Sequence, residues 1–422
     1  LIDSEYQNLG VTIGANYRNK ERDFASQFSG VEEHSTTTLN PSSIDGLSSI
    51  FTPENFDAGL LLINELQPDR YNATLESAAG FLTANYNSEK FYVTAGIRFQ
   101  SDNLNVVYDV GNLPGRIGSS QLSYENFYPS LNFKYQLNDR NNIRLAASKT
   151  ISLPEFKEVS PFEYVSQTGE VTRGNPDVKA STNYNLDLKY EFYPSNSQLV
   201  SITGFYKRIV DPINKVQDRG SAGVYSYFNT SEKAEIYGLE METNLELLTP
   251  ETTSGIELDL NLNATRMWHF QDLKVIRNED GTFIKTYRYK GLTEIGLEGA
   301  SNWIFNGSLN FSTNAENELR ASIIANYASD KIYALGAPEI QTQSETFYND
   351  AIIEKGFATL NAVLSKDFGE HWNLEFTGEN LLNPEIKRTQ KIKPSISNIE
   401  TTETLRSYTK GVVLSLGINY NF

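Results

Sequence analysis

Apolar and polar residues alternate along most of this chain with the two-residue period of β-strands. Residues 256–263 read IELDLNLN, so four aliphatic side chains point to one face of a strand and four polar side chains to the other. Comparable runs predict about fourteen strands, and many of them have ten or more residues. Strands of soluble domains usually have about five or six residues, whereas tilted strands that cross a membrane need about nine to eleven.

The predicted connections alternate between short polar turns and long segments. The short turns lie near 87–90, 138–141, 194–197, 249–254, 313–317 and 367–371, and the long segments are 21–70, 109–122, 153–180, 211–228, 271–290, 330–354 and 383–404. This alternation is typical of a membrane barrel with short periplasmic turns and long extracellular loops. It predicts an all-β fold, a transmembrane antiparallel up-and-down β-barrel, with residues 1–422 as a single domain. A soluble sandwich or propeller would have shorter strands and no such alternation.

The C-terminal segment, residues 411–422 (GVVLSLGINYNF), has the same alternation and ends on an aromatic residue. The spacing of Gly417, Tyr420 and Phe422 resembles the signal by which bacterial barrel-assembly machinery recognises outer-membrane proteins. We therefore expect a location in a Gram-negative outer membrane, with the C-terminus in the periplasm and the long loops outside the cell.

Composition excludes several other classes of protein. The longest wholly apolar run, 58–63, has six residues, far fewer than the ~20 that a membrane helix needs. A net charge of −17 without a basic stripe argues against nucleic acid as a partner. There is no cysteine and no G-x-S-x-G motif, and His34, His269 and His371 are widely spaced, so we predict neither an enzyme nor a cofactor.

The segment 21–70 is strongly acidic. Between Val31 and Asp69 it has no Lys or Arg, and its acidic residues are Glu32, Glu33, Asp45, Glu54, Asp57, Glu65 and Asp69. These oxygens could hold Ca²⁺, but the spacing is not that of an EF-hand, and a solvated acidic lid is the alternative. We expect residues 56–66 to form a short helix that packs on the barrel mouth. The acidic charge favours a neutral or cationic ligand.

Aromatic residues gather in the predicted outer loops. The candidates for ligand contact are Phe162, Tyr164, Tyr225, Tyr227, Tyr333 and Tyr348. For those near strand ends, the alternative is the aromatic girdle at the membrane interface. The predicted inner face carries both signs of charge, which favours a wall that holds a polar plug over an ion-selective pore; its charged residues are Arg98, Arg144, Asp187, Lys189, Glu191, Glu240, Glu242, Glu246, Glu257 and Asp259.

A set of short motifs, in the same order along the chain, resembles the barrel of TonB-dependent outer-membrane receptors. The motifs are 71–76 (YNATLE), 96–99 (GIRF), 128–132 (YPSLN), 143–148 (IRLAAS), 153–156 (LPEF), 174–178 (GNPDV), 205–207 (FYK), 211–213 (DPI), 237–242 (YGLEME), 379–383 (ENLLN) and the terminal Phe422. Each motif is weak alone, but together they extend over nearly the whole chain.

The resemblance implies a barrel of twenty-two strands that encloses an N-terminal plug, and an active transporter of a scarce, bulky nutrient such as a siderophore, vitamin, oligosaccharide or peptide. Its partners would be outer-membrane lipid, the assembly machinery and the TonB complex, which contacts the plug segment. No plug is recognisable in this sequence, so we expect the C-terminal portion of such a barrel. The alternatives are a self-contained passive channel of about fourteen strands, and a surface scaffold that docks another protein such as a lipoprotein.

Overall fold

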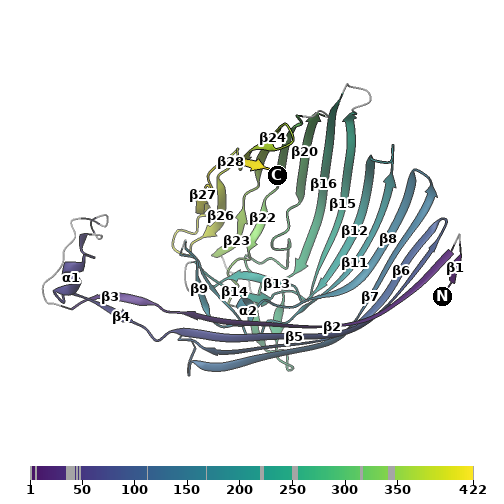
Figure 1. Cartoon of the computed structure of the whole chain (residues 1–422). Coiled ribbons are helices and arrows are strands. Elements are labelled where there is room, and N and C mark those ends of the chain that lie inside the picture. The colour runs from purple at the N-terminus through teal and green to yellow at the C-terminus, as the bar shows by residue number, and fades with distance from the viewer. Residues whose placement is uncertain are drawn as a thin grey trace.

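The computed structural model describes residues 2–4, 7–34, 43, 46, 49–111, 113–167, 169–218, 223–249, 255–313, 317–340 and 347–421. In this part of the chain, fourteen strands of 8 to 22 residues form one antiparallel sheet in which chain neighbours are sheet neighbours (Figure 1). In order they are β2 (Gln7–Ser26), β5 (Asp69–Ser88), β6 (Phe91–Asp109), β7 (Ile117–Asn138), β8 (Asn141–Ser152), β11 (Ser181–Phe192), β12 (Leu199–Val210), β15 (Lys233–Leu248), β16 (Ile256–Asp272), β20 (Trp303–Thr313), β21 (Leu319–Ala328), β24 (Phe357–Phe368), β25 (Trp372–Glu379) and β28 (Val413–Tyr420). The predicted all-β antiparallel architecture and its number of strands are confirmed.

Short turns join the strands at one end of this sheet, the turn side, and long connections join them at the other end, the loop side. Residues 89–90 and 139–140 make two of the turns, whereas 153–180 and 380–412 are long connections. The predicted turns at 249–254 and 313–317 fall largely on residues outside the described part of the chain. The connection after β6 is shorter than predicted, because β7 already begins at Ile117.

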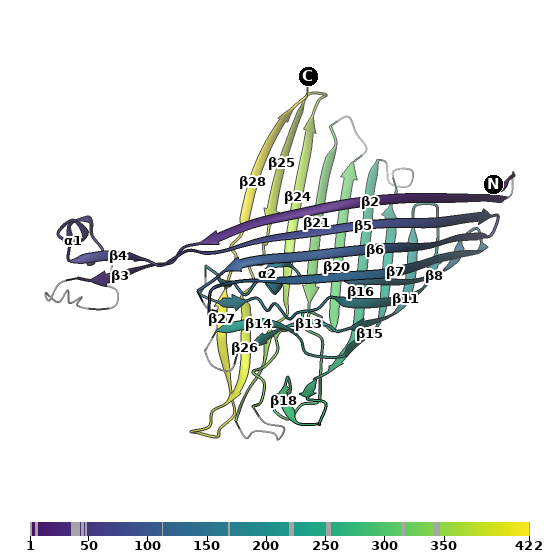
Figure 2. The ribbon, with the colours of Figure 1, turned by 90° about the horizontal axis from the view of Figure 1, so that it is seen from below.

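The described sheet is open. Its strand order begins with the short strand β1 (Ile2–Ser4) beside β2 and ends at β28, while β19 (Glu294–Ile295) adds two residues beside β16. The sheet curves into a trough, as Figures 1 and 2 show from two directions. No helix in the described part of the chain is long and apolar enough to cross a membrane.

The two faces of the sheet differ as the alternation predicts. On the outer face, Leu186, Leu188 and Ile202 are each about half exposed. Aromatic pairs flank this apolar band on both sides. Near the loop side, the ring centres of Tyr206 and Tyr237 are 4.9 Å apart. Near the turn side, the ring centres are 4.9 Å apart in the pair Phe91–Tyr135 and 4.8 Å apart in the pair Trp372–Tyr420. This is the pattern of a barrel exterior in lipid.

Charged side chains of both signs pair on the inner face. Arg144 Nε lies 2.8 Å from Glu191 Oε1, and Lys189 Nζ lies 2.9 Å from Glu242 Oε2. The strand registers place Arg144 directly beside Lys189 on the neighbouring strands β8 and β11, and Glu242 two strands away on β15, beyond β12, all on the face opposite the apolar one. Four of the ten charges predicted for the inner wall, Arg144, Lys189, Glu191 and Glu242, therefore form a cross-strand network of ion pairs.

The long connections form small sheets of their own. One has the order β13 (Ile213–Gln217), β14 (Val224–Asn229), β10 (Val171–Arg173), β9 (Glu163–Val165), and the other has β22 (Lys331–Ala334), β23 (Tyr348–Glu354), β26 (Ile386–Lys393), β27 (Thr401–Tyr408). Two smaller elements accompany them, the helix α2 (Phe156–Val159) and the pair β17 (Val275–Arg277) and β18 (Phe283–Thr286). A bridge between Val216 and Leu335 joins the two loop sheets, and both residues belong to a buried apolar cluster with Tyr289.

The segment after β2 corrects two predictions. The strands extend to Ser26 and resume at Asp69, and between them β3 (Ser29–Glu33) pairs with β4 (Leu61–Glu65), so part of the predicted 21–70 loop is a β-ribbon. The expected helix over 56–66 is wrong: α1 spans Pro53–Asp57, and Leu61–Glu65 is extended because it pairs with β3. The ribbon projects away from the rest of the molecule instead of covering the mouth (Figures 1 and 2).

Candidate functional site

Motif residues fix the long connections in place. A Cβ on Gly174 would lie 1.7 Å from the carbonyl oxygen of Ser160, so only glycine fits there. The next residue, Asn175, donates its backbone N–H to Glu158 O (2.7 Å) and its side-chain amide to Tyr227 O (2.9 Å). The first bond closes the connection 153–180 on itself, and the second joins it to β14. The GNPDV motif thus has a structural role in shaping the loop side.

A pocket of about 510 Å³ opens between the two loop sheets. Residues from both sheets line it, including Glu170, Tyr225, Ile352, Arg388, Leu405 and Arg406. Its wall combines charged groups with apolar side chains and one aromatic ring, which suits a bulky solute that has a polar group.

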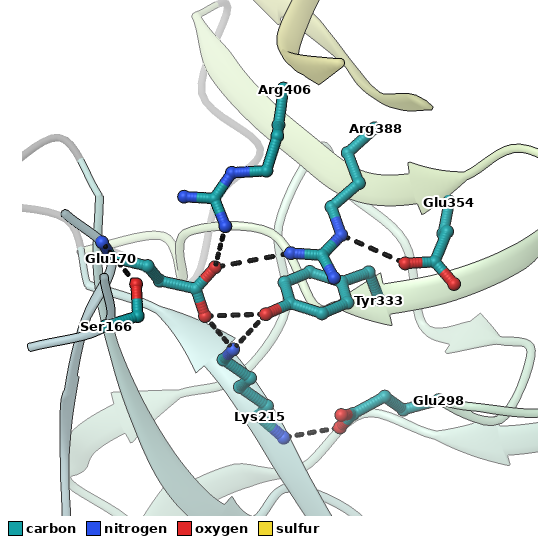
Figure 3. Close-up of polar contacts among 8 residues, drawn as sticks. All are labelled: Ser166, Glu170, Lys215, Glu298, Tyr333, Glu354, Arg388 and Arg406. Atoms are coloured by element: carbon teal, nitrogen blue, oxygen red, sulfur yellow. Dashed lines mark hydrogen bonds and ion pairs between the residues drawn. The ribbon is translucent and has the colours of Figure 1, made fainter. Parts of the chain in front are cut away.

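The carboxylate of Glu170 lies at the centre of the polar contacts in this pocket (Figure 3). Its Oε1 accepts hydrogen bonds from Lys215 Nζ and, at 2.6 Å, from the hydroxyl of Tyr333. Its Oε2 lies 3.4 Å from Arg388 NH1 and 3.8 Å from Arg406 NH1. One carboxylate therefore joins four donors from β13, β22, β26 and β27.

Neighbouring contacts hold the donors themselves. Arg388 Nε lies 3.0 Å from Glu354 Oε2, and its guanidinium lies 3.4 Å from the centre of the Tyr333 ring. Lys215 Nζ lies 4.5 Å from the centre of the Tyr225 ring. Cation–π contacts of this kind stabilise cations that have lost part of their hydration.

Burial and hydrogen bonding act against each other on Glu170. Burial, the largest single effect, raises the pKa of this carboxyl group, but the hydrogen bonds from Lys215 and Tyr333 and the positive charges of Lys215 and Arg388 together outweigh it and hold the pKa of Glu170 below its usual value. The side chains of Glu170, Lys215 and Arg388 are only 12%, 11% and 14% exposed. Glu170 is therefore ionised at neutral pH, and it neutralises part of a cationic site.

Four of the six predicted ligand-contact residues lie in two places, at the pocket and in a buried cluster. Tyr225 lines the pocket and Tyr333 lies beside it, 6.3 Å away between ring centres. Phe162 is 1% exposed and belongs to a buried cluster, and the hydroxyl of Tyr164 donates to that of Tyr71 at 2.8 Å. Ligand contact therefore stays a prediction, and the geometry favours it most for Tyr225 and Tyr333.

The other predicted candidates lie elsewhere on the loop side. Tyr227 is half-buried on β14, and burial raises its pKa. Tyr348 begins β23, where its hydroxyl bonds to Glu400. In the described residues, no three His, Asp or Glu side chains lie close enough together to hold a metal ion; Asp45 of the acidic segment is outside this part.

The proposed assembly signal is at the turn side. Gly417 pairs with Glu375, and Tyr420 pairs with Trp372, both on the last strand β28. Phe422 lies outside the described residues. Recognition by the assembly machinery stays a prediction for all three residues.

Sequence reasoning missed the charged residues of the pocket. Glu170 and Arg388 are 218 positions apart, and they belong to different long connections. The only local signals in the sequence are the glycine before Glu170, Gly169, and the charged run at 387–393 (KRTQKIK) that contains Arg388. Neither signal indicates a partner, so a contact between these loops was not predictable from the pattern alone.

This chain matches one protein family, and its fold is similar to several solved structures. Residues 3–381 match the family model described as TonB dependent receptor-like, beta-barrel. The structure is similar to that of the siderophore receptor PiuA from Acinetobacter baumannii, with 11% identity, a TM-score of 0.61, and coverage of 99% of this chain and 54% of that one. It is also similar to the ferric yersiniabactin uptake receptor FyuA from Yersinia pestis, with 14% identity, a TM-score of 0.55, and coverage of 100% and 52%.

A third similar structure is the FrpB iron transporter from Neisseria meningitidis, with 14% identity, a TM-score of 0.51, and coverage of 99% and 53%. No curated protein sequence matches this chain. The chain spans about half the length of these three proteins. At such identities the likeness shows the fold.

Proposed function

We propose that this chain, which belongs to the TonB dependent receptor-like β-barrel family, forms barrel wall and ligand-receiving loops of an outer-membrane transporter. The transporter would import a scarce, bulky nutrient at the expense of the proton gradient. The loop side would face outside the cell and the C-terminus the periplasm.

The observation that carries the proposal is the joining of the long connections into two sheets around one pocket. Passive barrels need loops only to close turns or narrow a pore, whereas a receptor needs a surface that recognises one solute before transport. The paired charges of the inner wall support the same function, since a wall of mixed sign can hydrogen-bond a polar plug.

The TonB complex would act on a plug encoded in a part of the protein other than this sequence. Residues 1–422 would then be the C-terminal portion of a single barrel domain that encloses this plug. Outer-membrane lipid and the barrel-assembly machinery would be the other partners, with a surface lipoprotein as a further candidate. Among nutrient classes, ferric siderophores come first, because the similar structures include a siderophore receptor and a ferric yersiniabactin uptake receptor. Vitamins, oligosaccharides and peptides follow.

The test is energised uptake by the complete gene product. A strain deleted for the gene, and the same strain carrying it on a plasmid, are grown on limiting iron, cobalamin, oligosaccharide or peptide, with and without a protonophore in short uptake assays. We expect one class of solute to be taken up only by the complemented strain and only when the membrane is energised. Uptake that persists without the proton gradient would instead indicate a passive channel.

A further inference from the structure

Four donors surround a single carboxylate in the loop-side pocket. Lys215 and Tyr333 contact one oxygen of Glu170, and Arg388 and Arg406 lie within 3.8 Å of the other. Three other acidic residues lie here: Glu354 is near Arg388 and Lys331, and Asp218 and Glu403 line the pocket. Without Glu170, Lys215, Arg388 and Arg406 would lose the carboxylate that they share.

Glu170 lies on a small structural unit. It follows a tight turn in which Ser166 N–H donates to Glu170 O (2.8 Å) and Glu170 N–H donates to the hydroxyl of Ser166 (2.9 Å). The strands that flank this turn, β9 and β10, have three residues each. Segments with so few backbone bonds open at lower free-energy cost than the long strands around them.

The donors, in contrast, lie on elements with independent support. Arg388 is also held by Glu354 and lies over the ring of Tyr333, and neither of these contacts involves Glu170. Lys215 lies on β13, whose backbone bonds to β14 and to Leu335. Movement of the turn would leave a prearranged set of donors, which would be costly without an anion.

We propose that Glu170 is an internal substitute for an oxyanion of the ligand, and that a solute with a carboxylate or phosphate group enters the pocket by taking Lys215, Arg388 and Arg406 from it. This inference rests on the proposed function for the direction from which the solute arrives. The apolar residues Ile352 and Leu405 of the same pocket would contact the remainder of the solute. The acidic ribbon, from which we expected a neutral or cationic ligand, projects away from this pocket.

The test measures binding alone. The complete gene product, purified in detergent at low ionic strength, is titrated calorimetrically with succinate, with its uncharged analogue succinamide, and with inorganic phosphate. In Glu170→Gln the amide preserves the shape but no longer competes as an anion, so we expect succinate to bind at least about tenfold more tightly than in the wild type. In Arg388→Gln we expect at least about tenfold weaker binding.

Two further variants serve as controls. Asp330→Asn removes a carboxylate of another loop-side ion pair, Asp330–Lys355 (2.7 Å), and should bind succinate as the wild type does. Arg388→Lys keeps the charge but loses the planar fork, and should give intermediate affinity. Heat-modifiable electrophoretic mobility verifies that each variant is folded.

The inference is overturned if Glu170→Gln binds succinate no more tightly than the wild type, or if succinamide binds as well as succinate. If phosphate responds to the variants as succinate does, the pocket accepts both oxyanions; if it does not, the pocket selects carboxylates. Normal energised uptake without the Glu170 effect would reject this inference alone. The Glu170 effect without energised uptake would reject the transport function and leave an anion-binding site.

Discussion

Protonation of Glu298 should set the pH dependence of the loop side. Glu298 lies in the connection between β16 and β20, and its Oε2 accepts a hydrogen bond from the backbone N–H of Lys215 on β13. A backbone bridge joins it to Ile332 on β22. Burial raises the pKa of Glu298 to about 8. This residue thus joins three connections and is largely protonated at neutral pH.

The direction of the pH effect follows from the linkage between protonation and stability. An unfolded glutamate has a pKa of about 4.3, so the folded state holds a proton that the open state releases, and stability falls as pH rises between the two values. Each pH unit in this window costs about 1.4 kcal/mol. Between pH 6 and pH 8 we expect a loss of about 2 kcal/mol, which is roughly a thirtyfold lower protection of the amides that opening exposes.

Hydrogen exchange measured by mass spectrometry tests this expectation. Peptides that contain Lys215 are followed in the complete gene product at pH 6, 7 and 8, with correction for the intrinsic exchange rates. Glu298→Gln keeps an acceptor for the Lys215 N–H and cannot ionise, so its protection factor should be constant. Glu279→Gln, in the exposed turn between β17 and β18, should behave as the wild type does. Equal pH slopes in wild type and Glu298→Gln would refute the reasoning.

Two further predictions concern the fold. Gly174→Ala places a Cβ 1.7 Å from Ser160 O and should make the connection 153–180 sensitive to protease while the barrel stays heat-modifiable. Gly10→Ala, where a Cβ would have nothing within 4 Å, should change neither property. Protease resistance of both variants would contradict the account. Leu188→Arg on the outer face, where Leu188 is 56% exposed, should destabilise the protein in lipid by about 2–4 kcal/mol. Asp187→Arg on the inner face should cost less, and urea unfolding in vesicles measures both losses. Equal losses would mean that the two faces are wrongly assigned.

The sequence was sufficient to predict the large antiparallel sheet because the strands of this sheet depend on a local signal. Where one face is apolar and the other polar, as in 256–263, the two-residue period fixes both the strand and its orientation. The long connections have no such signal. Leu61–Glu65 reads as part of a short apolar helix until Ser29–Glu33 is available to pair with it, and this pairing depends on residues more than twenty positions away.

The pocket shows the same limit more strongly. The alternation of turns and loops predicts that the aromatic candidates share one side of the sheet, and Tyr225 and Tyr333 do lie together. Phe162 instead lies in a buried cluster with Phe156 and Val159 of α2. The four donors around Glu170, three cations and the hydroxyl of Tyr333, come from four separate strands, so only the tertiary arrangement of the loops places them together.

The central claim is that this sheet spans an outer membrane with its long connections outside the cell, and single-cysteine labelling tests it most directly. The 422 residues contain no cysteine, so Thr282→Cys on the loop side and Ser195→Cys on the turn side can be introduced separately. With a membrane-impermeant maleimide on intact cells, we predict labelling at position 282 and labelling at position 195 only after the outer membrane is opened. Labelling at position 195 in intact cells, or at neither position until lysis, would contradict the account.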